Sequence, residues 1–159
     1  MFVSLTSEIR WCGTKELTEK LSRSVDYICD YIYDLEWQYS VNSILRKNTE
    51  NQRAIFIVLR LLHAKDIEEH NIKSYYRYNK QKNCLAIDIV FSIEDYVNLS
   101  EKEIVQNLSK AIYEYIYTFI GKYDNKIKDF DVAMFLSVLD ERLTGLERKL
   151  IGSNEPTVK

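Results

Sequence analysis

The sequence predicts an α+β fold in which an antiparallel sheet of about five strands carries two to three packed helices. The strand signal is strongest at residues 84–91, where apolar side chains alternate with smaller or polar ones. A helix signal follows at Ser100 and Glu103, whose spacing is that of a capping box at a helix start. A strand followed closely by a capped helix indicates that strands and helices share one core.

The first two elements are predicted to be a strand and a long helix. Residues 2–9 alternate weakly between apolar and polar side chains, which favours a strand. Gly13 breaks this pattern, and Thr14 has the chemistry of a helix N-cap. Over residues 14–37 the apolar side chains fall on one arc of a helix. They are Leu17, Leu21, Val25, Ile28, Ile32 and Leu35.

Two hairpins are predicted in the middle of the chain. Residues 38–47 and 53–63 are rich in β-branched and aliphatic side chains, and a polar turn separates them. The second of these strands is apolar on both faces, so we expect it to be central in the sheet. A charged loop at 66–71 then leads to a second hairpin, formed by residues 73–79 and 84–91.

Two further helices are predicted, over residues 100–121 and 131–143, with Gly145 interrupting the second. The predicted order is therefore β-α-β-β-β-β-α-α, with the helices packed on one face of the sheet. We expect residues 1–151 to form a single domain and residues 152–159 to form a flexible polar tail.

Composition excludes several classes of protein. The chain has 159 residues, of which 46% are hydrophobic and 29% are charged, as in an ordinary globular domain. Its net charge of −2 argues against a protein that mainly grips nucleic-acid backbone. The three cysteines include no C-x-x-C pair, so we expect reduced thiols. No signal peptide or membrane-spanning run is visible, and we therefore expect a cytoplasmic protein.

No motif in the sequence supplies a catalytic group or a cofactor site. The chain lacks a zinc-protease helix, a nucleophile elbow, a phosphate-binding loop and a dinucleotide fingerprint. His63, His70 and Asp66 lie close together in the sequence, but their spacing is not that of a known metal motif. We therefore predict no enzyme activity, no cofactor and no metal; an enzyme with an unfamiliar site on these three residues is the alternative.

The long first helix carries an unusual acidic surface. With 100° between successive residues, five carboxylates fall on an arc opposite the apolar one, and Arg23 alone interrupts it. They are Glu16, Glu19, Asp26, Asp30 and Asp34, with Tyr33 and Trp37 on the same arc or its edge. Carboxylates beside exposed aromatic rings suit the docking of a basic protein. We therefore predict a partner-binding site at Asp26, Asp30, Tyr33, Asp34 and Trp37, although a solvated helix face has the same pattern.

Two other surfaces are rich in tyrosine. Tyr113 and Tyr117 lie one turn apart, opposite the apolar arc of their helix, and form a contact patch or pack under a neighbouring loop. Residues 73–82 interleave basic side chains with three tyrosines, as in a stacking surface for single-stranded nucleic acid. A small nucleic-acid-binding regulator is therefore an alternative function, and a non-catalytic interaction subunit is another.

The arrangement of elements resembles that of bacterial immunity proteins. The shared features are a short first strand, one long helix, the strand Leu-Ala-Ile-Asp-Ile-Val at 85–90, and the Ser-x-x-Glu helix start. The segment 88–96, Asp-Ile-Val-Phe-Ser-Ile-Glu-Asp-Tyr, which enters that helix, adds to the likeness. The resemblance covers residues 2–143 and points to the immunity proteins of polymorphic toxin and contact-dependent growth-inhibition systems.

This resemblance implies a non-enzymatic antitoxin that binds a cognate toxin domain, often a nuclease, and blocks it by direct protein–protein contact. A nuclease carries a basic groove for its substrate, and carboxylates placed over such a groove imitate phosphates. The acidic arc of the first helix fits that role. Because these families diverge quickly, no toxin-contacting residue follows from the resemblance itself.

Overall fold

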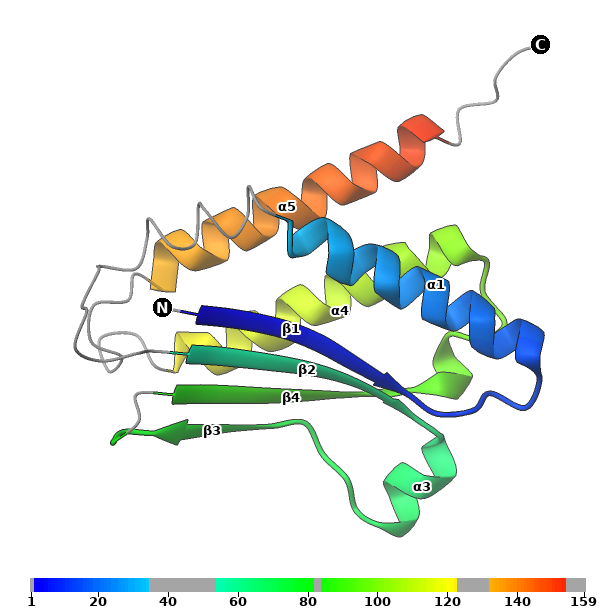
Figure 1. Cartoon of the computed structure of the whole chain (residues 1–159), viewed down its shortest axis with the longest axis horizontal. Coiled ribbons are helices and arrows are strands. Elements are labelled where there is room, and N and C mark those ends of the chain that lie inside the picture. The colour runs from blue at the N-terminus through cyan, green and yellow to red at the C-terminus, as the bar shows by residue number, and fades with distance from the viewer. Residues whose placement is uncertain (1, 35–53, 82–83, 123–131, 154–159) are drawn as a thin grey trace.

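The computed structural model describes residues 2–34, 54–81, 84–122 and 132–153. Within these ranges the chain forms one four-stranded sheet and several helices, so the predicted α+β class is confirmed (Figure 1). The elements are, in order, β1 (Phe2–Ile9), α1 (Lys15–Ile32), β2 (Ala54–Leu62), α3 (Ala64–Glu69), β3 (Tyr75–Asn79), β4 (Cys84–Ser92), the 3₁₀ turn η1 (Ile93–Asp95), α4 (Glu101–Gly121) and α5 (Val132–Ser153).

The prediction of a purely antiparallel sheet is wrong. The strand order is β1-β2-β4-β3, in which β2 pairs in parallel with both β1 and β4. The connection from β1 to β2 contains α1, and a helical crossover returns the chain to the same end of the sheet, where the next strand runs parallel. As predicted, β2 is central, but the expected partner strand at 38–47 lies outside the described residues.

The second predicted hairpin is confirmed. Strand β3 pairs antiparallel with β4 in a register that places Tyr76 opposite Ile87 and Tyr78 opposite Leu85. Along β4, buried residues alternate with half-buried ones, as the period-2 pattern predicts. One side of the sheet therefore faces a core, and the other side does not.

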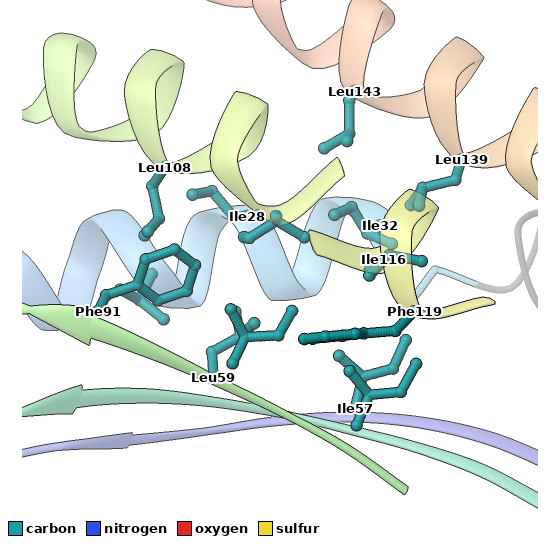
Figure 2. Packing of buried hydrophobic residues seen from close by; sticks show 14 of the residues in the cluster. Ile28, Ile32, Ile57, Leu59, Phe91, Leu108, Ile116, Phe119, Leu139 and Leu143 are labelled. Carbon is teal, nitrogen blue, oxygen red and sulfur yellow. The ribbon is translucent and has the colours of Figure 1, made fainter. Parts of the chain in front are cut away.

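The three long helices lie in two layers on one face of the sheet (Figure 1). α1 contacts β1 and α4 contacts β4, while α5 packs across α1 and α4. Aliphatic and aromatic side chains from the sheet and all three helices fill the space between them (Figure 2). Members of this core include Ile28, Ile32, Ile57, Leu59, Phe91, Leu108, Ile116, Phe119, Leu139 and Leu143.

Local capping signals place the helix starts correctly. The Thr14 side chain accepts a hydrogen bond from the Leu17 N–H at 3.1 Å, and Ser100 and Glu103 form the predicted capping box. Helix α1 ends earlier than predicted, with Tyr33 as its C-cap. The short helix α3 overlaps the predicted charged loop. It buries no side chain, so the sequence shows no apolar stripe that would predict a helix there.

Helix α5 runs through Gly145 without the predicted interruption. A Cβ atom at Gly145 would lie only 2.9 Å from the Tyr31 hydroxyl oxygen of α1. Glycine at this position therefore leaves room for the Tyr31 side chain where α5 packs against α1. The helix ends at Ser153, and residues 154–159 lie outside the described ranges.

Candidate interaction surfaces

The outward side of α1 carries the predicted acidic surface. Residues Leu21, Val25 and Ile28 are fully buried, which turns the opposite side of the helix to solvent. The exposed carboxylates on that side, here called the acidic face, are Glu16, Glu19, Asp26 and Asp30. Arg23, the cation within this surface, forms an ion pair with Glu101 at the start of α4, with 2.6 Å between Nη2 and Oε1.

The five predicted partner-binding residues are not equivalent. Asp26 and Asp30 are exposed and form no ion pair with a described residue. Asp34 is half-buried, and its Oδ2 lies 2.8 Å from Nη1 of Arg142 in α5. Tyr33 is also half-buried and packs against the core. Trp37 lies outside the described residues.

Cys29 lies on α1 beside two carboxylates of the acidic face, Asp26 and Asp30. Burial raises the pKa of the Cys29 thiol to about 12, and the carboxylates of Asp26 and Asp30 add to this rise. The thiol is therefore protonated at neutral pH and inert as a nucleophile. The two carboxylates thus generate a negative potential on this part of α1.

Tyrosines on α4 form a second exposed area. Tyr117 is 57% exposed, and its ring centroid lies 6.1 Å from that of the half-buried Tyr113. Both rings lie along the boundary between α4 and α5, as their shared cavity lining shows. The predicted exposure is therefore correct for Tyr117, whereas Tyr113 is partly covered.

Strand β3 does not present three tyrosines to one side. Tyr76 and Tyr78 turn toward the core, where the Tyr76 ring centroid lies 5.3 Å from that of Phe119. Only Tyr75, which is 51% exposed, shares the other side of the sheet with Arg77. A hydrogen bond to Asp88 raises the pKa of Tyr75. The proposed stacking surface for nucleic acid is therefore reduced to a single ring.

The side of the sheet away from the long helices is a further candidate. In its middle Arg60 lies between Glu8 and Asp88, at 3.6 and 3.9 Å. Phe56, on the same side of β2, is 39% exposed. Parallel strands are usually covered on both faces, so this partly apolar area is unusual for strands of this kind.

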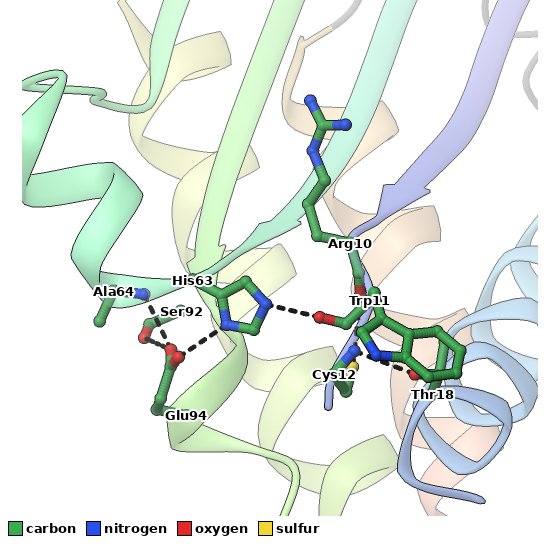
Figure 3. Close-up of polar contacts among 8 residues, drawn as sticks. All are labelled: Arg10, Trp11, Cys12, Thr18, His63, Ala64, Ser92 and Glu94. Carbon is green, nitrogen blue, oxygen red and sulfur yellow. Dashed lines mark hydrogen bonds and ion pairs between the residues drawn. The ribbon is translucent and has the colours of Figure 1, made fainter. Parts of the chain in front are cut away.

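A polar cluster joins the carboxyl ends of the three parallel strands (Figure 3). His63, directly after β2, places Nδ1 2.9 Å from Glu94 of η1, while Nε2 faces the Trp11 carbonyl oxygen after β1. Glu94 also accepts hydrogen bonds from the Ala64 N–H and the Ser92 hydroxyl. We call His63, Glu94 and the Trp11 carbonyl the edge cluster.

Charge strengthens the edge cluster. The hydrogen bonds to Glu94 and to the Trp11 carbonyl raise the pKa of His63, because only the imidazolium can donate from both nitrogens. Partial burial raises the pKa of Glu94, but hydrogen bonds from Ala64 and His63 outweigh it, and this pKa is about 2. Glu94 carries no signal in the sequence, since only parallel pairing brings the ends of β2 and β4 to one edge.

The edge cluster separates the two histidines. Both ring nitrogens of His63 are engaged there, whereas His70 forms a separate group with Asp66 and Glu69. The ligand atoms of this second group lie within 4.8 Å of one another. The structure therefore does not unite His63, His70 and Asp66 as one catalytic or metal site.

Comparison with known families identifies the class of protein. A family model described as Immunity protein 44 matches residues 1–145. The chain therefore belongs to this family of immunity proteins, which confirms the resemblance inferred from its sequence. An immunity protein neutralises a toxin, and proteins of this kind are typically non-catalytic.

No curated protein and no solved structure matches the chain significantly. Among the described residues, no helix has both the length and the apolarity needed to cross a membrane.

Proposed function

We propose that this immunity protein binds its cognate toxin domain directly and that the acidic face of α1 forms part of the contact. The observation that carries the proposal is the pair Asp26 and Asp30, two exposed carboxylates one helical turn apart. Neither forms an ion pair with a described residue, so both remain available to cations of a partner.

The rest of the predicted site supports this pair. The ion pair between Asp34 and Arg142 fixes the end of α1 against α5, so the acidic face is held in a defined orientation. We include Tyr33, through the exposed part of its half-buried side chain, and Trp37 as the aromatic contacts of this surface. Aromatic rings buried on binding contribute much of the affinity at protein interfaces.

The chemistry of the surface favours a nuclease as the toxin. A nuclease needs a basic groove to hold the phosphates of its substrate, and a row of carboxylates complements such a groove. Inhibition would then follow from occupying the groove or the surface beside it, with no catalytic step by the immunity protein.

Charge reversal tests the acidic face. Asp26→Lys together with Asp30→Lys should reduce the association rate with a catalytically inactive toxin domain by about tenfold or more, because electrostatic steering is lost. The reduction should shrink at high salt, since screening weakens interactions between exposed charges. Stopped-flow kinetics at two ionic strengths measures both effects.

A matched control separates position from net charge. Glu68→Lys with Glu69→Lys makes the same change in charge on α3, which lies on the other side of the sheet from α1 (Figure 1). This control should change the association rate by less than about twofold. Equal slowing by both double variants, or no slowing by either, would contradict a toxin contact at the acidic face.

A further inference from the structure

A cavity lies between α4 and α5 and opens to solvent. Its volume is about 350 Å³, within the range of side-chain and small-ligand sites. The Tyr113 ring of α4 lines it, together with Leu143 and Leu146 of α5. The groove continues past Tyr113 into a neighbouring hollow lined by Tyr117. This shape suits one long side chain whose own backbone continues along the groove.

The polar lining of the cavity is strongly acidic. The lining includes three carboxylates, from Glu114, Asp140 and Glu147, but only one ammonium group, that of Lys110. None of the three carboxylates has an ion-pair partner in the described parts of the chain. Asp140 is close enough to Tyr113 that, after burial, its charge raises the pKa of that phenol. The cavity therefore presents unneutralised negative charge beside an aromatic ring.

A buried hydroxyl in the same lining lacks a partner. Ser109 is 6% exposed, and its Oγ has no hydrogen-bond partner in the part of the chain that the structure describes. A buried polar atom left unsatisfied is costly and uncommon in folded proteins. In a helix a serine hydroxyl can bond to the carbonyl four residues earlier, but Ser109 does not do so. A ligand donor in the cavity could reach this atom only after the Ser109 side chain rotates, because less than 1 Å² of the oxygen is accessible.

We propose that this cavity binds the guanidinium group of an arginine from the cognate toxin domain. The partner in this inference rests on the proposed function, whereas the ligand chemistry rests on the cavity alone. A guanidinium is a permanent cation with five donors in a planar fork, and it stacks on aromatic faces. It therefore matches the carboxylates and the Tyr113 ring better than a compact ammonium does.

A small probe tests the ligand chemistry without the toxin. Nα-acetyl-arginine amide, titrated into the isotope-labelled full chain, should shift the amide resonances of Ser109, Tyr113 and Asp140 in a saturable manner. Nα-acetyl-citrulline amide has nearly the same shape but no charge, and should bind about tenfold more weakly or not at all. Equal responses to both probes, or no saturable shifts, would overturn the proposal.

Neutral variants locate the site. Asp140→Asn with Glu147→Gln should abolish the saturable response to the arginine probe while leaving the rest of the spectrum unchanged. Glu141→Gln with Glu68→Gln removes two exposed carboxylates outside the cavity and should leave the response intact. Retention of the response in the first variant would overturn the assignment to this cavity.

The same variants test the partner. Asp140→Asn with Glu147→Gln should raise the Kd for the toxin domain by about tenfold, and the control pair should change it by less than about twofold. If the arginine probe binds but the cavity variant retains full toxin affinity, the toxin assignment is overturned while the proposed function stands. If the wild-type chain does not bind the toxin domain, the proposed function itself fails.

Discussion

His63 is the residue whose protonation most directly affects the edge cluster. Its raised pKa means that the imidazolium contributes stability below the unfolded value of about 6.5, and that this contribution is lost as the pH rises through the higher folded value. Because both side chains are partly exposed, solvent screening limits the pair to about 1 kcal/mol or less.

His63→Asn should lower the melting temperature more at pH 6 than at pH 9, because the stabilising imidazolium is present only at the lower pH. His70→Asn, an exposed change on the neighbouring segment, should show no such difference between the two pH values. A His63→Asn effect that is the same at both pH values would show that the imidazolium is not what stabilises the cluster.

Glu94 gives the acidic side of the same dependence. Its pKa is lowered to about 2, so its stabilising effect is present above the unfolded value of 4.5 and is lost as the pH falls through the folded one. The edge cluster should therefore add most to the free energy of unfolding between the unfolded pKa of Glu94, 4.5, and that of His63, 6.5. Sequence analysis did not find this pair, because it joins residues that are 31 positions apart.

Ser109 provides a second prediction at the residue scale. Ser109→Ala removes a buried, unsatisfied hydroxyl and adds helix propensity, so it should raise the free energy of unfolding by about 1 kcal/mol. Ser137→Ala, an exposed change in α5, should gain only the propensity of about 0.5 kcal/mol. Urea unfolding measures both, and equal gains would indicate that the Ser109 hydroxyl carries no penalty.

At the scale of elements, the packing of α1 against α5 depends on Gly145. Gly145→Ala should stabilise the wild type by less than about 0.5 kcal/mol, because the Tyr31 side chain must shift away from the new methyl group and this offsets part of the gain in helix propensity. In a Tyr31→Phe background the hydroxyl oxygen is absent, and the same change should stabilise by about 0.5–1 kcal/mol through helix propensity. Equal gains in both backgrounds, measured by urea unfolding, would contradict this explanation.

Elements that depend on contacts between residues near one another in the sequence could be predicted, whereas those that depend on distant partners could not. The starts of α1 and α4 depend on Thr14 and Ser100, each of which bonds only three residues ahead, and both were predicted correctly. The direction of strand pairing depends on partners far along the chain, and alternation looks the same in parallel and antiparallel sheets. The close approach of Tyr31 to Gly145 joins residues more than a hundred positions apart, so no local pattern reports it.

The candidate sites divide in the same way. Helical periodicity alone was enough to place Asp26 and Asp30 on the solvent side of α1. The pairing of Asp34 with Arg142 and the cavity between α4 and α5 arise only when distant helices pack together. Periodicity therefore predicts which side chains are exposed, but not which exposed side chains share a site.

In the whole molecule, the three long helices cover one face of the sheet (Figure 1). The carboxylates of the acidic face are exposed, whereas Leu21, Val25 and Ile28 of α1 are buried in the core. Membership of the Immunity protein 44 family gives the chain a toxin as its partner. The net charge of −2 and the exposed carboxylates of α1 are consistent with a basic one. We therefore propose that the chain neutralises its toxin by binding it directly through this surface.

Co-expression with the cognate toxin domain tests this proposal, with growth and co-purification measured together. We expect that the wild-type chain restores growth and purifies as a complex with the toxin domain. The Asp26→Lys and Asp30→Lys double variant should do both poorly, and the control on α3 should behave as the wild type. Growth restored without a complex, or a toxin that remains lethal in the presence of the wild-type chain, would contradict the account.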